Sequence, residues 1–147
     1  MAFLDEAKRI ASDLGVITAA DARPCSEQEI EVLEQRVGRR LPGAYREFLM
    51  WVGHAAGDFW AGSHAFYADL PNIQRWAAEL LRENSFPEPL ADDALVFFMH
   101  QGYQFMFFRP SEGDDPPVYD YNETRPAQNF VRRANHFSQF LEHALRT

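Results

Sequence analysis

Two histidines and an aspartate in the middle of the chain, His54, Asp58 and His64, are of types that coordinate metal ions. A zinc-binding helix would place two histidines one turn apart, as in His-Glu-x-x-His, and a zinc finger would add a pair of cysteines. The spacing of these residues matches neither pattern, and Cys25 is the sole cysteine of the chain. The favoured interpretation is therefore the ordinary polarity of a loop, with no metal site.

Other polar segments lack what catalysis or ion binding requires. The segment Glu112-Gly113-Asp114-Asp115 has neither the alternating oxygen ligands nor the downstream glutamate of a calcium loop, so a solvated turn is favoured. The sequence indicates no histidine partner for Cys25, which disfavours a thiolate nucleophile. No general acid–base pair and no nucleophile with its base can be assembled. We therefore predict a protein that is not an enzyme and that binds no cofactor.

The charge of the chain limits its partners. It carries 22 acidic against 14 basic residues, a formal net charge of −8. Such a surface repels phosphate backbones and anionic lipids, so neither nucleic acid nor a membrane is an expected partner. The sequence shows no apolar stretch of membrane-spanning length and no signal peptide, and one cysteine cannot form an intramolecular disulfide. We expect a cytoplasmic protein, and the oligomeric state stays open.

Acidic residues concentrate between residues 92 and 123, and they are the candidates for binding another protein. One interpretation is a solvated acidic face; the other is a surface complementary to a basic protein, which would speed association. Aromatic side chains would then supply apolar contacts, since exposed charge pairs are individually weak. The candidate residues are the acids Asp92, Asp93, Glu112, Asp114, Asp115, Asp120 and Glu123 and the aromatics Trp60, Tyr119 and Tyr121.

The elements that must position these residues begin with helices. A chain of 147 residues has the length of one domain, and apolar residues at helical spacing predict an N-terminal helix over 1–15. Ser26 and Glu29 form a capping box that starts a second helix, which Gly38 ends. Further helices are predicted after Leu41-Pro42, from about Pro71, and from Phe137 to Leu145 with Asn135 as its cap.

The second half of the chain contains the predicted strands. Apolar runs at 95–99 and 103–108 are joined by a turn, and a third strand covers 118–121. We expect the first two strands to form the centre of the sheet. Their face with Tyr103, Phe105 and Phe107 should lie near the Tyr45/Phe48 stripe of the third helix. Helices followed by strands and a final helix indicate an α+β fold.

Several segments, taken in order, resemble the SUKH superfamily, which includes the Smi/Knr-type cell-wall assembly regulators. They correspond to its opening acidic helix, its Leu-Pro step, its central strand pair, its next strand and its closing helix. In this chain the segments are SEQEIEVLE at 26–34, VGRRLPGAYREFL at 37–49, VFFMHQGY at 96–103, PVYDY at 117–121 and NHFSQFL at 135–141. The resemblance covers about residues 26–145 and departs from the family pattern in the turn from Gly53 to Gly57.

This resemblance implies a single SUKH-like α+β domain over 1–147, with helices packed against a mostly antiparallel sheet. Many bacterial members of the superfamily are thought to be immunity proteins that bind and neutralise a cognate toxin, often a nuclease. The expected function is therefore that of a non-enzymatic immunity protein whose partner is a basic toxin. Two alternatives stay open: an intracellular regulator or scaffold of the Smi/Knr kind without a toxin, and an enzyme with an unrecognised site.

Overall fold

The computed structural model describes residues 2–126 and 128–147. These residues form five α-helices, seven β-strands and two short 3-10 turns. In chain order the elements are α1 (Asp5–Asp13), β1 (Ala22–Arg23), α2 (Glu27–Val37), α3 (Gly43–Val52), β2 (Ala55–Ala56), β3 (Ser63–His64), η1 (Tyr67–Asp69), α4 (Leu70–Glu83), β4 (Leu95–His100), β5 (Gln104–Phe108), η2 (Pro110–Glu112), β6 (Val118–Asn122), β7 (Val131–Ala134) and α5 (Phe137–Arg146).

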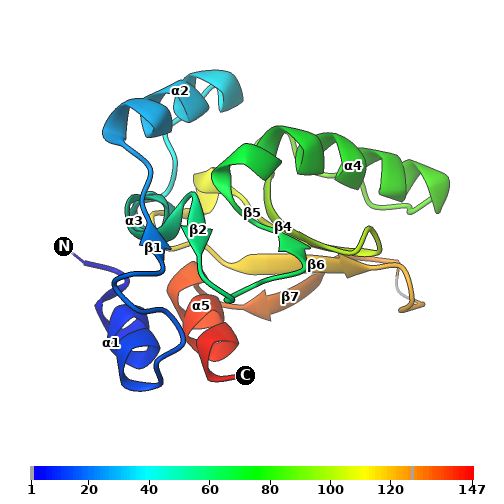
Figure 1. Ribbon diagram of the computed structural model, residues 1–147. Helices are drawn as coiled ribbons and strands as arrows, with labels where there is room; N and C mark the ends of the chain where they lie inside the picture. The colour runs from blue at the N-terminus through cyan, green and yellow to red at the C-terminus, as the bar shows by residue number, and fades with distance from the viewer. Residues whose placement is uncertain (1, 127) are drawn as a thin grey trace.

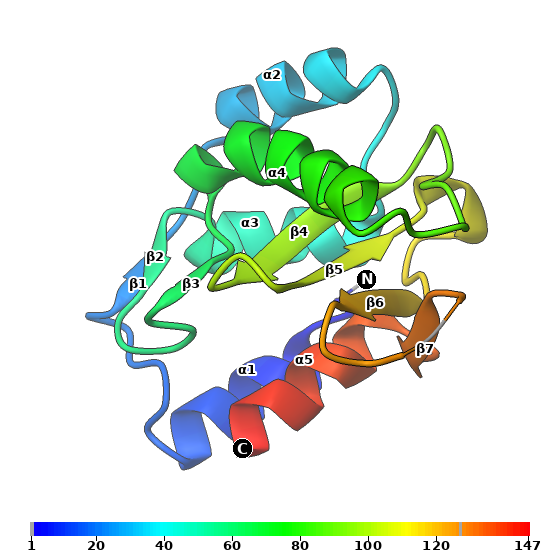
Figure 2. The same cartoon turned by 90° about the vertical axis from the view of Figure 1, so that its right-hand side faces the viewer.

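The strands make two antiparallel sheets. The larger has five strands in the order β3-β4-β5-β6-β7, and the smaller pairs β1 with β2 (Figure 1). Helix α4 lies on one side of the larger sheet, whereas α1 and α5 lie on the other (Figure 2). The predicted α+β fold with helices on an antiparallel sheet is confirmed.

Local signals place the helices where the sequence predicts them. The Ser26 hydroxyl accepts the Glu29 backbone N–H at 3.2 Å, and the Glu29 carboxylate accepts the Ser26 N–H at 2.9 Å, which completes the capping box. Gly38 ends α2 in the left-handed conformation, with φ of 77°, which a residue without a Cβ adopts without strain. These two signals fix where α2 begins and ends.

Two layers of aromatic rings cover opposite faces of the sheet. On one face, the fully buried Tyr45 of α3 contacts Phe108 of β5 and Phe137 of α5, with ring centroids 5.0 and 5.6 Å apart. On the other face, Phe105 and Phe107 of β5 contact other rings, with Phe107 4.9 Å from Phe130. The prediction that Phe105 and Phe107 lie near the Tyr45 stripe is therefore wrong: successive residues of a strand point to opposite faces, and it is Phe108 that faces Tyr45.

Helix α4 also protects part of a sheet edge. Strand β3 pairs with β4 at Met99 and His100, which leaves the first half of β4 without a strand neighbour on that side. The side-chain amide of Gln74 fills this place. Its Nε2 donates to the Val96 carbonyl at 2.6 Å, and its Oε1 accepts the Val96 N–H at 3.0 Å. A backbone edge that would otherwise invite another strand is thereby satisfied.

Truncating either aromatic layer should destabilise the fold. Phe48 and Phe105 are both at most 1% exposed, one on each side of the sheet. Replacing either by alanine should lower the free energy of unfolding by about 3–5 kcal/mol, through lost burial and the cavity left behind. Equilibrium urea unfolding measures this. Met50, which is 44% exposed, is the control, and its alanine variant should change stability by less than about 0.5 kcal/mol. Losses below about 1 kcal/mol at both Phe48 and Phe105 would contradict the two-layer core.

Candidate protein-binding surface

Five of the predicted acids gather at one end of the larger sheet. Asp92 and Asp93 precede β4, and the other three lie between β5 and β6. Leu95 of β4 pairs with Phe108 of β5, and Phe107 pairs with Tyr119 of β6, so the start of β4, the end of β5 and the start of β6 meet. The acids are Asp92, Asp93, Glu112, Asp114 and Asp115.

Asp93 ties the two loops at this end together. Its carboxylate accepts Arg109 Nε at 2.8 Å and the Ser111 backbone N–H at 3.1 Å, and its side chain is 6% exposed. Burial by itself would raise the pKa of Asp93, but the hydrogen bonds from Ser111 and Arg109 outweigh it and lower the pKa to about 2. Asp93 therefore holds the shape of this surface and presents little charge to solvent.

Asp114 and Asp115 stabilise the starts of two helices. Asp114 accepts the N–H of Gly43 on its side chain at 3.1 Å and the N–H of Ala44 on its carbonyl at 2.9 Å, both at the start of α3. Asp115 accepts the backbone N–H of Ser138 at 2.9 Å and its hydroxyl at 2.6 Å, in the first turn of α5. The prediction that Asn135 caps α5 is wrong. The residue before the helix is His136, whose side chain forms no cap, and the Asp115 carboxylate instead accepts the free N–H of the first turn.

Two of the candidate residues are buried and cannot contact a partner. Asp120 is 0% exposed and forms ion pairs with Arg125 and Arg133. Tyr121 is 5% exposed, and its hydroxyl accepts the Asn84 side-chain N–H at 2.9 Å. The prediction that Asp120 and Tyr121 belong to a binding surface is therefore corrected. A buried carboxylate needs a cation beside it, which Arg125 and Arg133 supply to Asp120.

Glu123 and Trp60 lie away from the acidic end. Glu123 follows the opposite end of β6, where it is exposed and accepts Asn84 Nδ2 at 3.2 Å. Trp60 is half-buried in the loop between β2 and β3, where its ring stacks on Phe59 with centroids 4.5 Å apart. The structure therefore does not bring these two residues together with the other candidates.

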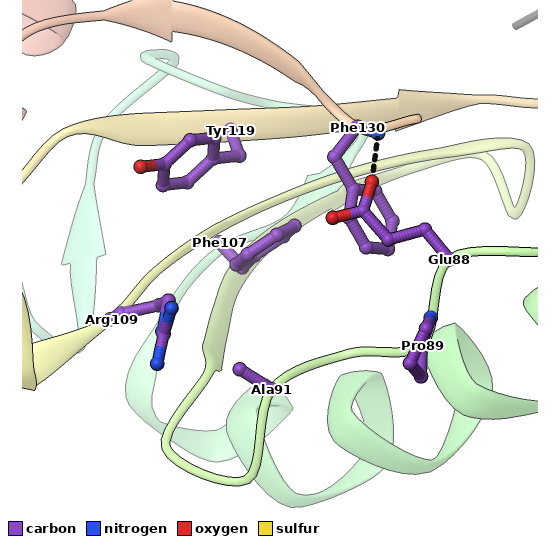
Figure 3. A pocket seen from close by; sticks show the side chains of 7 residues that line it. All are labelled: Glu88, Pro89, Ala91, Phe107, Arg109, Tyr119 and Phe130. Atoms are coloured by element: carbon purple, nitrogen blue, oxygen red, sulfur yellow. Dashed lines mark hydrogen bonds between the residues drawn. The ribbon is translucent and has the colours of Figure 1, made fainter. Parts of the chain in front are cut away.

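A hollow with an aromatic floor opens beside the acidic end (Figure 3). It has a volume of about 180 Å³ and is lined by Glu88, Pro89, Ala91, Phe107, Arg109, Tyr119 and Phe130. We call these residues, together with the exposed acids Asp92 and Glu112, the acidic hollow. Its floor is aromatic, and Glu88 supplies a carboxylate within the lining. Glu112 accepts the hydroxyl of the lining residue Tyr119, and Asp92 follows the lining residue Ala91 in the chain. A concave floor with carboxylates close by is suited to holding a side chain of a protein partner.

Contacts among the lining residues fix the shape of the acidic hollow. The Phe107 ring stacks on Tyr119 at 5.3 Å, and the Tyr119 hydroxyl donates to both Glu112 oxygens at 3.1 Å. Glu88 accepts the Phe130 backbone N–H at 2.8 Å across the opening (Figure 3). Charge and residue type in the sequence indicate Tyr119 and Glu112, whereas the apolar strand pattern places Phe107 inside the protein and no sequence signal marks Glu88 or Phe130. Glu88 and Phe130 line the hollow only because the loop between α4 and β4 crosses the face of the sheet and brings Glu88 to the Phe130 backbone.

The histidines considered as metal ligands are not assembled with Asp58. The His64 ring lies edge-on to Trp76, and His54 Nε2 lies 2.9 Å from the Glu29 carboxylate. Ser63 and His100 are hydrogen-bonded at 2.8 Å, but they are directly paired residues of β3 and β4.

Among the helices of the described ranges, 2–126 and 128–147, none combines the length and the hydrophobicity that crossing a membrane requires.

The pKa of Asp93 predicts how stability depends on pH. A folded pKa of about 2, against an ordinary value of 3.8 for an aspartate, contributes stability that is full above about pH 4 and is lost as the pH falls towards 2. Asp93→Asn should cost about 2 kcal/mol at pH 7, and about half of that at pH 3. Urea unfolding at the two pH values measures this, with the exposed Asp92→Asn as control. A cost that does not change with pH would contradict the assignment.

Comparison with known proteins complements this geometry. A search of curated proteins found no match. The model of the SMI1 / KNR4 family (SUKH-1) matches residues 24–143, which include α2 to β7 and most of α5. The resemblance predicted from the Leu-Pro step, the central strand pair and the closing helix is confirmed over nearly the same range. The chain therefore belongs to the SMI1/KNR4 (SUKH-1) family.

Proposed function

We propose that this chain is a cytoplasmic, non-enzymatic immunity protein that binds and neutralises a basic toxin through the acidic hollow. The observation that carries the proposal is the aromatic floor of Phe107, Tyr119 and Phe130. Two exposed carboxylates adjoin its lining residues: Glu112 is hydrogen-bonded to Tyr119, and Asp92 follows Ala91 in the chain. Family membership supports a protein-binding role, because the SUKH group includes immunity proteins.

The two parts of the acidic hollow would contribute differently to binding. An apolar side chain of the toxin inserted against Phe107 and Tyr119 would supply most of the affinity, as buried anchors do in other interfaces. Asp92 and Glu112 would attract a basic cleft and orient it, which raises the association rate more than the affinity. A nuclease toxin offers such a cleft, because it must bind phosphates, and the carboxylates would occupy it in their place.

A regulatory or scaffold protein of the Smi/Knr kind is the alternative within the same family. The acidic hollow would then bind a basic cellular protein that is not a toxin. The same family match favours this alternative, since it covers regulators as well as immunity proteins. The two functions differ only in whether the bound protein is a toxin, so identifying that protein distinguishes them.

We also propose that residues 1–147 form one domain. Helix α1 precedes the family match, yet its Ala7, Ile10 and Ala11 are buried in the same core as Phe137 and Leu141 of α5. Figure 2 shows α1 and α5 side by side beneath the sheet.

Co-expression tests the toxin hypothesis. If the protein encoded next to this chain's gene is the toxin, a host that expresses it should stop growing, and co-expression of this chain should restore growth. The control is this chain with Phe48→Ala, which should fold too poorly to protect at raised temperature. Equal growth with and without this chain, although the neighbouring protein is toxic, would contradict the immunity function.

Association kinetics test the surface. The double variant Asp92→Asn/Glu112→Gln should slow association with that toxin by roughly tenfold at low salt and flatten its salt dependence, because two steering charges are lost. The melting temperature should barely change, since both side chains are exposed. The matched control Glu31→Gln/Asp58→Asn removes the same charge from exposed positions outside the acidic hollow. If both double variants slow association equally, net charge acts and the acidic hollow does not.

A further inference from the structure

Three side chains from separate segments converge at the start of α2. Cys25 precedes the helix, Glu29 lies in its first turn, and His54 follows α3. The Cys25 sulfur, a Glu29 oxygen and a His54 nitrogen all lie within 4.8 Å of one another. A thiol, a carboxylate and an imidazole form a donor set that binds zinc in proteins. None of the three residues belongs to the acidic hollow.

The backbone around these residues holds them in place. The Cys25 N–H donates to the Leu49 carbonyl at 2.8 Å, and the His54 N–H donates to the Arg23 carbonyl at 2.8 Å. The second bond continues the short pairing of β1 with β2. A Cβ on Gly53 would lie 2.3 Å from the Cys25 sulfur, so the close approach of the two segments requires glycine at this position. The segment before α2, the end of α3 and the β1–β2 pair are thereby held in fixed positions around Cys25 and His54.

Glu29 and His54 are also oriented. In the capping box the Ser26 N–H donates to Glu29 Oε1 at 2.9 Å, while Glu29 Oε2 lies 2.9 Å from His54 Nε2. The Tyr67 ring packs edge-on against the His54 ring with centroids 5.4 Å apart, and its hydroxyl donates to the Glu29 carbonyl at 2.9 Å. Outer contacts of this kind fix the direction of ligand side chains at metal sites.

We propose that Cys25, Glu29 and His54 form a zinc-binding site. Zinc bonds of about 2.3 Å to sulfur and about 2.0–2.1 Å to nitrogen or oxygen place tetrahedral ligand atoms about 3.3–3.6 Å apart. The three donor atoms need only small side-chain movements to reach that separation, and the metal takes the place of the proton shared by His54 and Glu29. Cys25 is 3% exposed, whereas the side chains of His54 and Glu29 are 38% and 37% exposed, so the fourth position faces solvent.

The same geometry disfavours a cysteine nucleophile. His54 Nε2 is bonded to Glu29, so it is not free to take a proton from the thiol. Zinc binding at this position would join the start of α2 to the end of α3 and stabilise the fold.

Cobalt is a spectroscopic probe for this site. Purified protein comprising residues 1–147, stripped with a chelator, should bind one equivalent of Co²⁺ with a sulfur-to-cobalt charge-transfer band that Zn²⁺ abolishes. Cys25→Ser should remove the band, and Glu29→Gln and His54→Ala should remove it at equimolar Co²⁺. Glu29→Gln is the most informative variant, because glutamine preserves the capping box and with it the start of α2. His143→Ala removes an exposed histidine elsewhere and is the matched control, which should keep the band.

Thermal unfolding supplies a second readout. Zn²⁺ should raise the melting temperature of the wild-type protein, because a ligand that binds the folded state stabilises it by mass action, and should not raise that of Glu29→Gln. Absence of the charge-transfer band in the wild-type protein would overturn the proposal. A band that persists in both Glu29→Gln and His54→Ala would overturn it as well, since the thiol would then bind cobalt without the other two residues.

Discussion

The need to cover β4 and β5 on both faces determines the rest of the architecture. Every residue from Leu95 to Met99 and from Phe105 to Phe108 is buried, so both faces of this strand pair must be covered. Helices α3 and α5 cover one face with Tyr45, Phe48 and Phe137. On the other face α4 covers part of the sheet, and the loop between α4 and β4 covers the remainder with Phe86 and its neighbours. Burial of apolar side chains such as these is the dominant favourable term in protein folding.

The acidic hollow lies on the face of the sheet that α4 and the loop between α4 and β4 cover. A loop packs less completely than a helix, and a concave space remains above Phe107 between Tyr119 and Phe130 (Figure 3). Asp93 and Arg109 then hold the loop before β4 against the loop after β5, so the hollow keeps its shape. The five acids at this end of the sheet have two roles: Asp93, Asp114 and Asp115 stabilise the fold through hydrogen bonds, while Asp92 and Glu112 are exposed.

Local features of the fold could be predicted from the sequence, and features set by distant partners could not. Ser26 and Glu29 are three positions apart, so their capping box is visible in the chain. Strand β7 was not predicted, because Arg132 and Arg133 give it no strand pattern and it forms by pairing with β6. Which face of β5 meets Tyr45 is undecidable from a run that is apolar on both sides.

The same distinction applies to the candidate site. The acidic end and Tyr119 were found from charge and residue type alone. Asp120 was misassigned, because its cations Arg125 and Arg133 reach it only in the folded sheet. The cluster of Cys25, Glu29 and His54 was also missed, since its members come together through the pairing of β1 with β2, and His54 was grouped with its sequence neighbours.

Amide hydrogen exchange of this chain, alone and with the proposed toxin partner, tests most directly whether the acidic hollow is the binding surface. The account predicts that the partner slows exchange in the loop from Glu88 to Asp93 and in the segment from Arg109 to Tyr119, while exchange in α1 and α5 is unchanged. Slower exchange confined to α1, α5 or the free edge of β7, with no change around the acidic hollow, would contradict it.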